Sequence, residues 1–171
     1  MPITRLNHAV LYVRNVETSA AFYRDALGFK AVMQMPGAAF LQAPGSTNDH
    51  DLGLFQIGAG AAGSEAGRST VGLYHLAWEV DTLDELARLS EVLSTRGALV
   101  GASDHSSTKS LYGHDPDGLE FEIAWIVPAA LLTQATLDER SGVQPLDLPK
   151  EIARYGGSTR GGVGVSIAAT P

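Results

Sequence analysis

The chain has no cysteine, no long apolar run and no basic segment, and each absence excludes a class of protein. Without cysteine there are no disulfides, no thiolate metal sites and no cysteine nucleophile. The net charge is −7, and Lys and Arg form no block, so nucleic acid is not an expected partner. No apolar stretch reaches membrane-spanning length, and the first residues lack the apolar core of a signal peptide. We therefore expect a cytoplasmic protein that does not bind membranes.

The composition that remains is that of a globular protein. Apolar residues make up 44% of the 171 residues and charged residues 18%, which argues against disorder and allows a substantial buried core. Since thiolates are absent, any bound metal ion must be held by imidazole and carboxylate groups.

Strand and helix signals occur twice along the chain, in the same order. A strand at residues 6–13 is followed by a helix that begins near Asn15 and ends at Gly28, where a glycine typically terminates a helix. A single shift of the sequence aligns His8 with His75 and Val13 with Val80, which indicates an internal repeat. The remaining predicted elements are strands at 31–35, 38–42, 51–57 and 72–80, a helix from about 83 to 96, and strands at 98–102, 110–113 and 119–126.

The repeat predicts an α+β fold. Two tandem βαβββ modules would form a curved eight-stranded sheet around a metal pocket, with the helices outside. We place the first module at residues 1–58, a Gly/Ala-rich linker or loop at 59–70 and the second module at 71–127. Residues 128–171 form a C-terminal extension that we expect to be partly flexible.

Three residues within the predicted strands suggest a metal site. His8 and His75 occupy equivalent positions in the repeat, and Glu122 lies between two apolar neighbours in the last strand. A carboxylate in an apolar strand needs a partner, because an unpaired buried charge is very costly. Two imidazoles and one carboxylate are the set that holds non-haem Fe(II) and leaves other coordination positions open. The sequence therefore predicts metal ligation by His8, His75 and Glu122.

Three motifs carry a resemblance to a known superfamily. They are Leu6-Asn7-His8, the segment Phe22-Tyr23-Arg24-Asp25-Ala26-Leu27-Gly28-Phe29, and Asp115-Pro116-Asp117-Gly118 followed by Glu122. With these motifs the chain resembles the vicinal-oxygen-chelate superfamily of glyoxalase I, bleomycin-resistance proteins, epimerases, fosfomycin-resistance enzymes and type I extradiol dioxygenases. The resemblance covers residues 4–127. It implies the fold more firmly than the reaction, because the superfamily supports several chemistries on one scaffold.

Further residues are similar to the pattern of the small extradiol (catechol 2,3-) dioxygenases. In those enzymes a tyrosine stands ten positions before the ligand glutamate, as Tyr112 stands before Glu122. A histidine slightly upstream of that tyrosine matches His105. Another histidine, placed before the second metal ligand, acts as the acid/base, and His50 is the candidate. The resemblance thus implies catalytic roles for His50, His105 and Tyr112.

The function implied by this resemblance is ring cleavage of a small aromatic diol by O2 at Fe(II), with Mn(II) as the second choice of metal. The resemblance also implies a homodimer or a higher homo-oligomer.

Two alternatives stay open at this stage. One is a metal-dependent lyase or isomerase of the glyoxalase or epimerase kind. That reading is weakened because the first-module counterpart of Glu122 is expected near Gln56, which is not an acid. The other alternative is a non-catalytic binding protein like the bleomycin-resistance group, which has no need of a ligand set.

Overall fold

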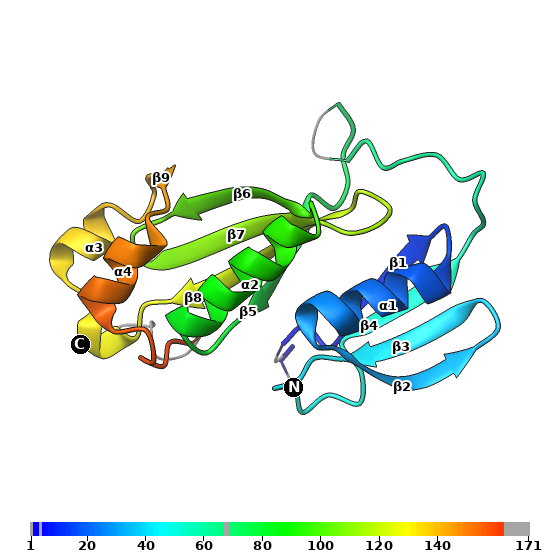
Figure 1. The fold of residues 1–171 in the computed structure, drawn as a ribbon, viewed down its shortest axis with the longest axis horizontal. Coiled ribbons are helices and arrows are strands. Elements are labelled where there is room, and N and C mark those ends of the chain that lie inside the picture. The colour runs from blue at the N-terminus through cyan, green and yellow to red at the C-terminus, as the bar shows by residue number, and fades with distance from the viewer. Residues whose placement is uncertain (1, 4, 67–68, 163–171) are drawn as a thin grey trace. The chain divides into compact units, whose positions relative to one another are not determined.

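The computed structural model describes residues 2–3, 5–66 and 69–162, and these divide into two compact units. The first unit comprises residues 1–65 together with 115–119, and the second comprises 66–114 and 120–171. Figure 1 shows the course of the chain through its helices and strands. None of the helices in the described ranges is long and apolar enough to cross a membrane.

The first unit contains a four-stranded sheet covered on one face by a helix. The strands are arranged in the order β1-β4-β3-β2, with β1 parallel to β4 and the other pairs antiparallel. Helix α1 begins after Asn15, whose side chain accepts the N–H of Thr18, and it ends at Gly28 in the left-handed conformation. The elements are β1 (Ala9–Val13), α1 (Val16–Leu27), β2 (Lys30–Met35), β3 (Ala38–Gln42) and β4 (Leu52–Gln56).

The second unit repeats this plan and adds a fifth strand. The order is β5-β8-β7-β6-β9, again with one parallel pair, β5 and β8. Helix α2 starts after Thr82, whose hydroxyl accepts the N–H of Glu85. The elements are β5 (His75–Glu79), α2 (Leu83–Thr95), β6 (Leu99–Asp104), β7 (Thr108–His114) and β8 (Glu120–Ile126), with β9 (Gln144–Pro145) on the outer edge of β6.

Each unit has its own apolar core between its sheet and its helix. In the first unit Leu52 and Leu54 of β4 are fully buried, and in the second Leu86, Leu111 and Trp125 are. Full burial of such a side chain contributes about 1.5–3 kcal/mol. The period-3.6 pattern of α2 accounts for its buried face, which consists of Leu83, Leu86, Leu89 and Leu93.

The predicted α+β fold with two βαβββ modules is confirmed, with two differences. The eight predicted strands are divided between two sheets, and the C-terminal extension supplies a ninth. In addition, β1 begins at Ala9, so His8 precedes the strand in which it was predicted. Before the strand, side chains contact this segment: the Asn7 carbonyl accepts the side-chain amide of Asn48, and the Asn7 side-chain oxygen is hydrogen-bonded to the ring of His8. Backbone hydrogen bonds between β1 and the chain entering β4 start only at Ala9, whose N–H donates to the carbonyl oxygen of Asp51.

The C-terminal extension, which the sequence analysis left without assigned elements, contains regular secondary structure in the described residues up to 162. It consists of a short 3-10 helix (Ala129–Leu131), α3 (Gln134–Asp138), β9 and α4 (Leu148–Tyr155). The N–H of Asp84 at the start of α2 donates to Gly157, and Gly161 donates to Asp81. Residues 163–171, the last part of the extension that we expected to be partly flexible, lie outside the described residues, and the flexibility of the extension stays a prediction.

Candidate functional site

One face of the second sheet brings together two of the three predicted metal ligands. His75 begins β5, and Glu122 lies on the parallel neighbour β8, where it is paired with Ala77. Nε2 of His75 lies 3.1 Å from Oε2 of Glu122. The hydroxyl of Ser110 on β7 donates to the other carboxylate oxygen, Oε1, at 2.5 Å. The carboxylate of Glu122, which needs a partner in an apolar strand, thus contacts the imidazole of His75 and the hydroxyl of Ser110.

Two further residues on this face were missed by the sequence analysis. Glu120 is paired with His75 in the β5–β8 register and with His114 in the β7–β8 register, so all three side chains share one face. Glu120 Oε1 lies 3.6 Å from Nδ1 of His75, and Glu120 Oε2 lies 3.7 Å from Nε2 of His114. Since register places His114 on the same face as Tyr112, alternation along β7 could have identified it.

Tyr112 and His105 form a second polar pair on the same unit. Nε2 of His105 lies 3.0 Å from the hydroxyl of Tyr112, and Tyr112 is directly opposite Glu122 in the sheet. Partial burial, reinforced by the negative charge of Glu122, raises the pKa of Tyr112 above its usual value. The phenol therefore remains protonated at neutral pH and can donate a hydrogen bond.

The other predicted site residues, His8 and His50, lie together in the first unit. Their ring centroids are 4.5 Å apart, and the His50 ring also stands edge-on to Phe40 at 5.2 Å. Nδ1 of His50 lies 3.0 Å from the carboxylate of Asp49, and this hydrogen bond lowers the pKa of Asp49. Because an ionised carboxylate only accepts, the contact places a proton of His50 on Nδ1, so that in a neutral ring Nε2 is the nitrogen with the lone pair.

The predicted residues therefore fall into two groups. His75, Glu122, His105 and Tyr112 belong to the second unit, while His8 and His50 belong to the first. Across the described ranges, no group of three or more His, Asp or Glu side chains is arranged to hold a metal ion. The structure brings together the pair His75 and Glu122 and, separately, the pair His8 and His50.

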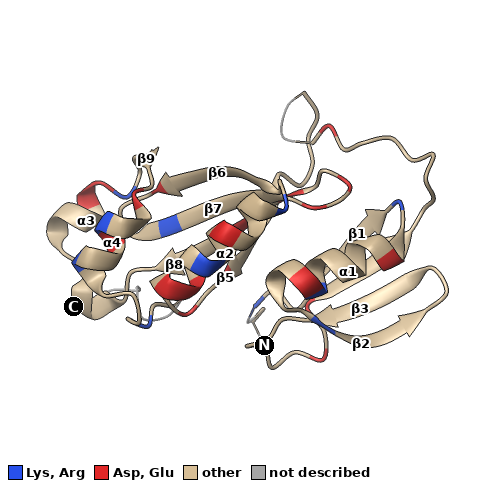
Figure 2. Ribbon diagram, in the orientation of Figure 1, with Lys and Arg blue, Asp and Glu red and all other residues tan. Residues whose placement is uncertain are grey.

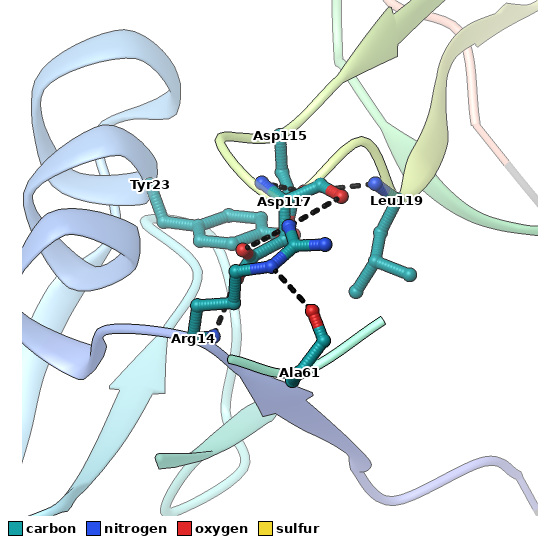
Figure 3. A network of polar contacts seen from close by, with 6 residues as sticks. All are labelled: Arg14, Tyr23, Ala61, Asp115, Asp117 and Leu119. Atoms are coloured by element: carbon teal, nitrogen blue, oxygen red, sulfur yellow. Dashed lines mark hydrogen bonds and ion pairs between the residues drawn. The ribbon is translucent and has the colours of Figure 1, made fainter. Parts of the chain in front are cut away.

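The turn between β7 and β8 belongs to the first unit, although the strands on either side belong to the second. Figure 3 shows its contacts: Tyr23 of α1 donates to Oδ2 of Asp115 at 3.4 Å, and Arg14 forms an ion pair with Asp117 at 2.9 Å. Oδ1 of Asp115 also accepts the N–H groups of Asp117 and Leu119, which closes the turn. Burial raises the pKa of Asp115 and, with the charge of Asp115 added, raises that of Tyr23 well above its usual value.

A sequence model of the Glyoxalase/Bleomycin resistance protein/Dioxygenase superfamily matches residues 5–123. The chain belongs to this superfamily. The match includes both βαβββ modules up to Ile123 of β8 and leaves the C-terminal extension outside.

Curated members of the superfamily with similar sequences are named as dioxygenases. The chain is 31% identical over 120 residues to a catechol-2,3-dioxygenase of Bacillus subtilis, covering 70% of this chain and 41% of that protein. It is 32% identical over 120 residues to a biphenyl-2,3-diol 1,2-dioxygenase of Rhodococcus globerulus, covering 70% of this chain and 62% of the relative. The matched part thus spans less than two thirds of either relative.

Solved structures of the superfamily confirm the fold without deciding the reaction. A lactoylglutathione lyase from Agrobacterium tumefaciens aligns with a TM-score of 0.55 at 21% identity, covering 72% of this chain and 95% of the lyase. At this identity the likeness concerns the fold alone.

Strand register corrects the expected counterpart of Glu122 in the first module. The repeat aligns His8 with His75. Two residues further along, Val10 therefore corresponds to Ala77. The partner of Val10 is Gly53, and the partner of Ala77 is Glu122. The counterpart is therefore glycine rather than Gln56, whose side-chain oxygen instead accepts the N–H of Val16 at the start of α1. The first module has no acid at this position.

Proposed function

We propose that the protein is an extradiol ring-cleaving dioxygenase that opens a small aromatic diol with O2. The observation that carries the proposal is the shared face of β7 and β8, where the His75–Glu122 pair adjoins the His105–Tyr112 pair. A candidate metal-ligand pair beside a neutral phenol and an imidazole suits a substrate whose two oxygens need both a metal and hydrogen-bond donors.

The donor set of this face fits a divalent metal ion. His75 offers nitrogen and Glu122 offers oxygen, and Nδ1 of His75 is buried without a hydrogen bond. A metal bound through Nε2 requires the ring proton on Nδ1, the nitrogen that Glu120 faces. We propose that His75 and Glu122 hold the metal with His8, whose part in the set rests on its equivalence to His75 in the repeat. The ion would lower the pKa of the diol hydroxyl groups and provide a site for O2.

The protein's own residues would move and hold protons. Tyr112, kept neutral by burial and by Glu122, would donate a hydrogen bond to a diol oxygen, and His105 would fix the direction of the Tyr112 hydroxyl. His50, with its Nδ1 proton held by Asp49, would take up a proton at Nε2 and return it to the leaving oxygen.

The substrate class and metal are part of the proposal. Two relatives named for catechol and biphenyl-2,3-diol support an aromatic diol. Fe(II) is the proposed metal and Mn(II) the second choice, because two imidazoles and a carboxylate with open positions suit a non-haem iron dioxygenase. A homo-oligomer and a cytoplasmic location stay predictions from the sequence.

The test is oxygen consumption by the metal-loaded protein. The purified protein is loaded anaerobically with Fe(II) or Mn(II), mixed with catechol or 2,3-dihydroxybiphenyl, and exposed to air in an oxygen-electrode cell. We expect stoichiometric oxygen uptake with a yellow ring-fission product, and no uptake by His75→Ala. Absence of uptake over a panel of diols with either metal would overturn the proposal. Turnover of a glutathione hemithioacetal by the Ni(II)- or Zn(II)-loaded protein would replace it with the lyase alternative.

A further inference from the structure

The C-terminal extension, outside the superfamily match, places a charged side chain in the interior of the second unit. Glu151 of α4 is 2% exposed and faces Lys109 of β7, which is 0% exposed. Their charged atoms, Oε2 and Nζ, are 2.9 Å apart, and the ring of Tyr155 lies 5.7 Å from the same Nζ. Lysine and glutamate are almost never fully buried unless paired, so this pair ties α4 to β7.

Lys109 also contacts Asp104, which leads into the turn between β6 and β7. Nζ of Lys109 contacts Oδ1 of Asp104 at 2.5 Å, and the same oxygen accepts the N–H of Ser106 at 2.7 Å. Ser106 has a φ of 64° and is the only non-glycine residue in the described ranges with a positive φ. Because side chains disfavour that conformation, the turn depends on the hydrogen bonds that hold it.

Backbone contacts of the extension reinforce the same region. β9 pairs with β6 at Ser103 and Asp104, the two residues that lead into the turn. On β8, which lies on the other side of β7 from β6, the indole N–H of Trp125 donates to the carbonyl of Thr159 in the extension. Figure 1 shows α4 and β9 beside the end of the second sheet where β6 leads into β7.

The turn held in this way carries His105. This residue lies between Asp104 and Ser106, and its N–H donates to Thr108. Its Nε2 is 3.0 Å from the Tyr112 hydroxyl. Along β7, Lys109 and Tyr112 point to opposite faces of the sheet. The Lys109–Glu151 contact therefore lies on one face, and the His105–Tyr112 hydrogen bond that the turn positions lies on the other.

We infer that the C-terminal extension is a positioning element of the site: Glu151, acting through Lys109 and Asp104, sets the turn that holds His105 against Tyr112. Glu151, Lys109 and Asp104 are positioning residues and touch no substrate. The catalytic meaning of the His105–Tyr112 pair rests on the proposed function, whereas the positioning itself does not.

The test removes the charges of Lys109 and Glu151 together, so that neither is left buried and unpaired. The double variant Lys109→Met/Glu151→Leu replaces both with apolar chains of similar size, an exchange that stability often tolerates. The matched control is Glu85→Gln, which breaks an exposed ion pair with Arg88 on α2. Amide hydrogen exchange of Ser106 and the ring ¹⁵N signals of His105 are measured by NMR, with His105→Gln used for assignment.

We expect the Ser106 amide of the double variant to exchange about 10- to 100-fold faster, as for loss of one hydrogen bond to a charged group. The His105 ring signals should move toward those of a solvent-exposed histidine, and the control should match the wild type. A double variant that folds with both signals unchanged would overturn the inference.

A second variant covers the case in which the double variant does not fold. The variant is Asp104→Ala. The Asp104 side chain is 21% exposed, and its removal leaves the buried Lys109–Glu151 pair intact. The same changes at Ser106 and His105 are expected, and their absence would also overturn the inference.

Activity provides a separate measurement. With metal-loaded protein, the variants should lower kcat for diol cleavage while leaving the metal Kd unchanged, since His75 and Glu122 are not altered. If the wild type cleaves no diol, the proposed function fails and the NMR measurement still decides the positioning role.

Discussion

The two modules share a topology but present different chemistry on the sheet face opposite the helix. In the second module this face carries His75, which forms ion pairs with Glu120 and Glu122, and it also carries Tyr112, which lies opposite Glu122. In the first module it exposes apolar groups: Val10 is 52% exposed, Tyr12 71% and Phe55 37%. One repeat therefore supplies carboxylates, and the other an apolar surface bordered by two histidines.

The difference shows that duplication of a fold does not duplicate its site. Where the second module has Glu122, the first has Gly53, so a single carboxylate remains at this pair of equivalent positions. The distribution of charge does not distinguish the modules: Figure 2 shows acidic and basic residues interspersed along both units. The distinction lies in a few positions of the strand register.

The largest effect is expected when the second module loses Glu122, the carboxylate that the first module lacks. Glu122→Gln should abolish metal binding, with a loss in affinity above the 10- to 100-fold typical of residues that only support a ligand. Oxygen uptake should fall to background. Isothermal titration with Mn(II) under anaerobic conditions measures the affinity. The control is Glu91→Gln on the exposed side of α2, and Mn(II) affinity in Glu122→Gln equal to that of the control would contradict the assignment.

In the first module, His50 is the residue whose loss should affect catalysis most. His50→Ala should lower kcat by about 10²–10⁴-fold, the usual contribution of a general acid or base, and leave metal affinity unchanged. Steady-state oxygen uptake and metal titration separate the two effects. Tyr12→Phe, a change on the exposed face of the same module, serves as the control. If His50→Ala lost metal binding instead, His50 would be a ligand rather than an acid/base.

Sequence patterns predicted the elements well because their signals are local. The alternation of strands, the helical spacing of apolar residues in α2 and the stop at Gly28 each depend on a few neighbouring residues. The repeat singled out His75, and the apolar strand singled out Glu122; the structure places these side chains in contact, and their role as metal ligands stays a prediction.

What the sequence could not predict depends on register and on distant contacts. His114 and Glu120 were not selected from the sequence, and it is the β7–β8 register that pairs them. The counterpart of Glu122 was placed near Gln56, because a uniform shift ignores the different connections before β4 and β8. The Lys109–Glu151 pair joins a strand to an extension for which the sequence shows no repeat.

Glu120 offers a weaker test of the second module's face. Glu120→Gln should reduce metal affinity about 10- to 100-fold, as for other carboxylates that orient a ligand histidine. The reason is that Glu120 faces Nδ1 of His75, the nitrogen that must carry the proton when Nε2 binds metal. The visible absorption of the Co(II)-substituted protein gives a second measurement independent of turnover. An unchanged affinity and spectrum would show that Glu120 does not orient His75.

Tyr23 tests the first module through stability rather than catalysis, and its effect should be the smallest. Tyr23→Phe removes the buried hydrogen bond to Asp115 and should cost about 1 kcal/mol of unfolding free energy near neutral pH. Urea unfolding measures this cost, with Tyr12→Phe, at an exposed site, as the control.

The pH dependence of the same variant has a definite sign. Burial and the Asp115 charge raise the pKa of Tyr23 in the folded state above its unfolded value near 10. The folded protein therefore binds this proton more tightly than the unfolded chain, and its contribution to stability is complete below about pH 10. As the pH rises from there through the folded pKa, the wild type should lose that stability, whereas Tyr23→Phe has no such proton to lose. The difference between the two unfolding free energies should consequently narrow above pH 10, and a constant difference would mean that Tyr23 is not buried against Asp115 in solution.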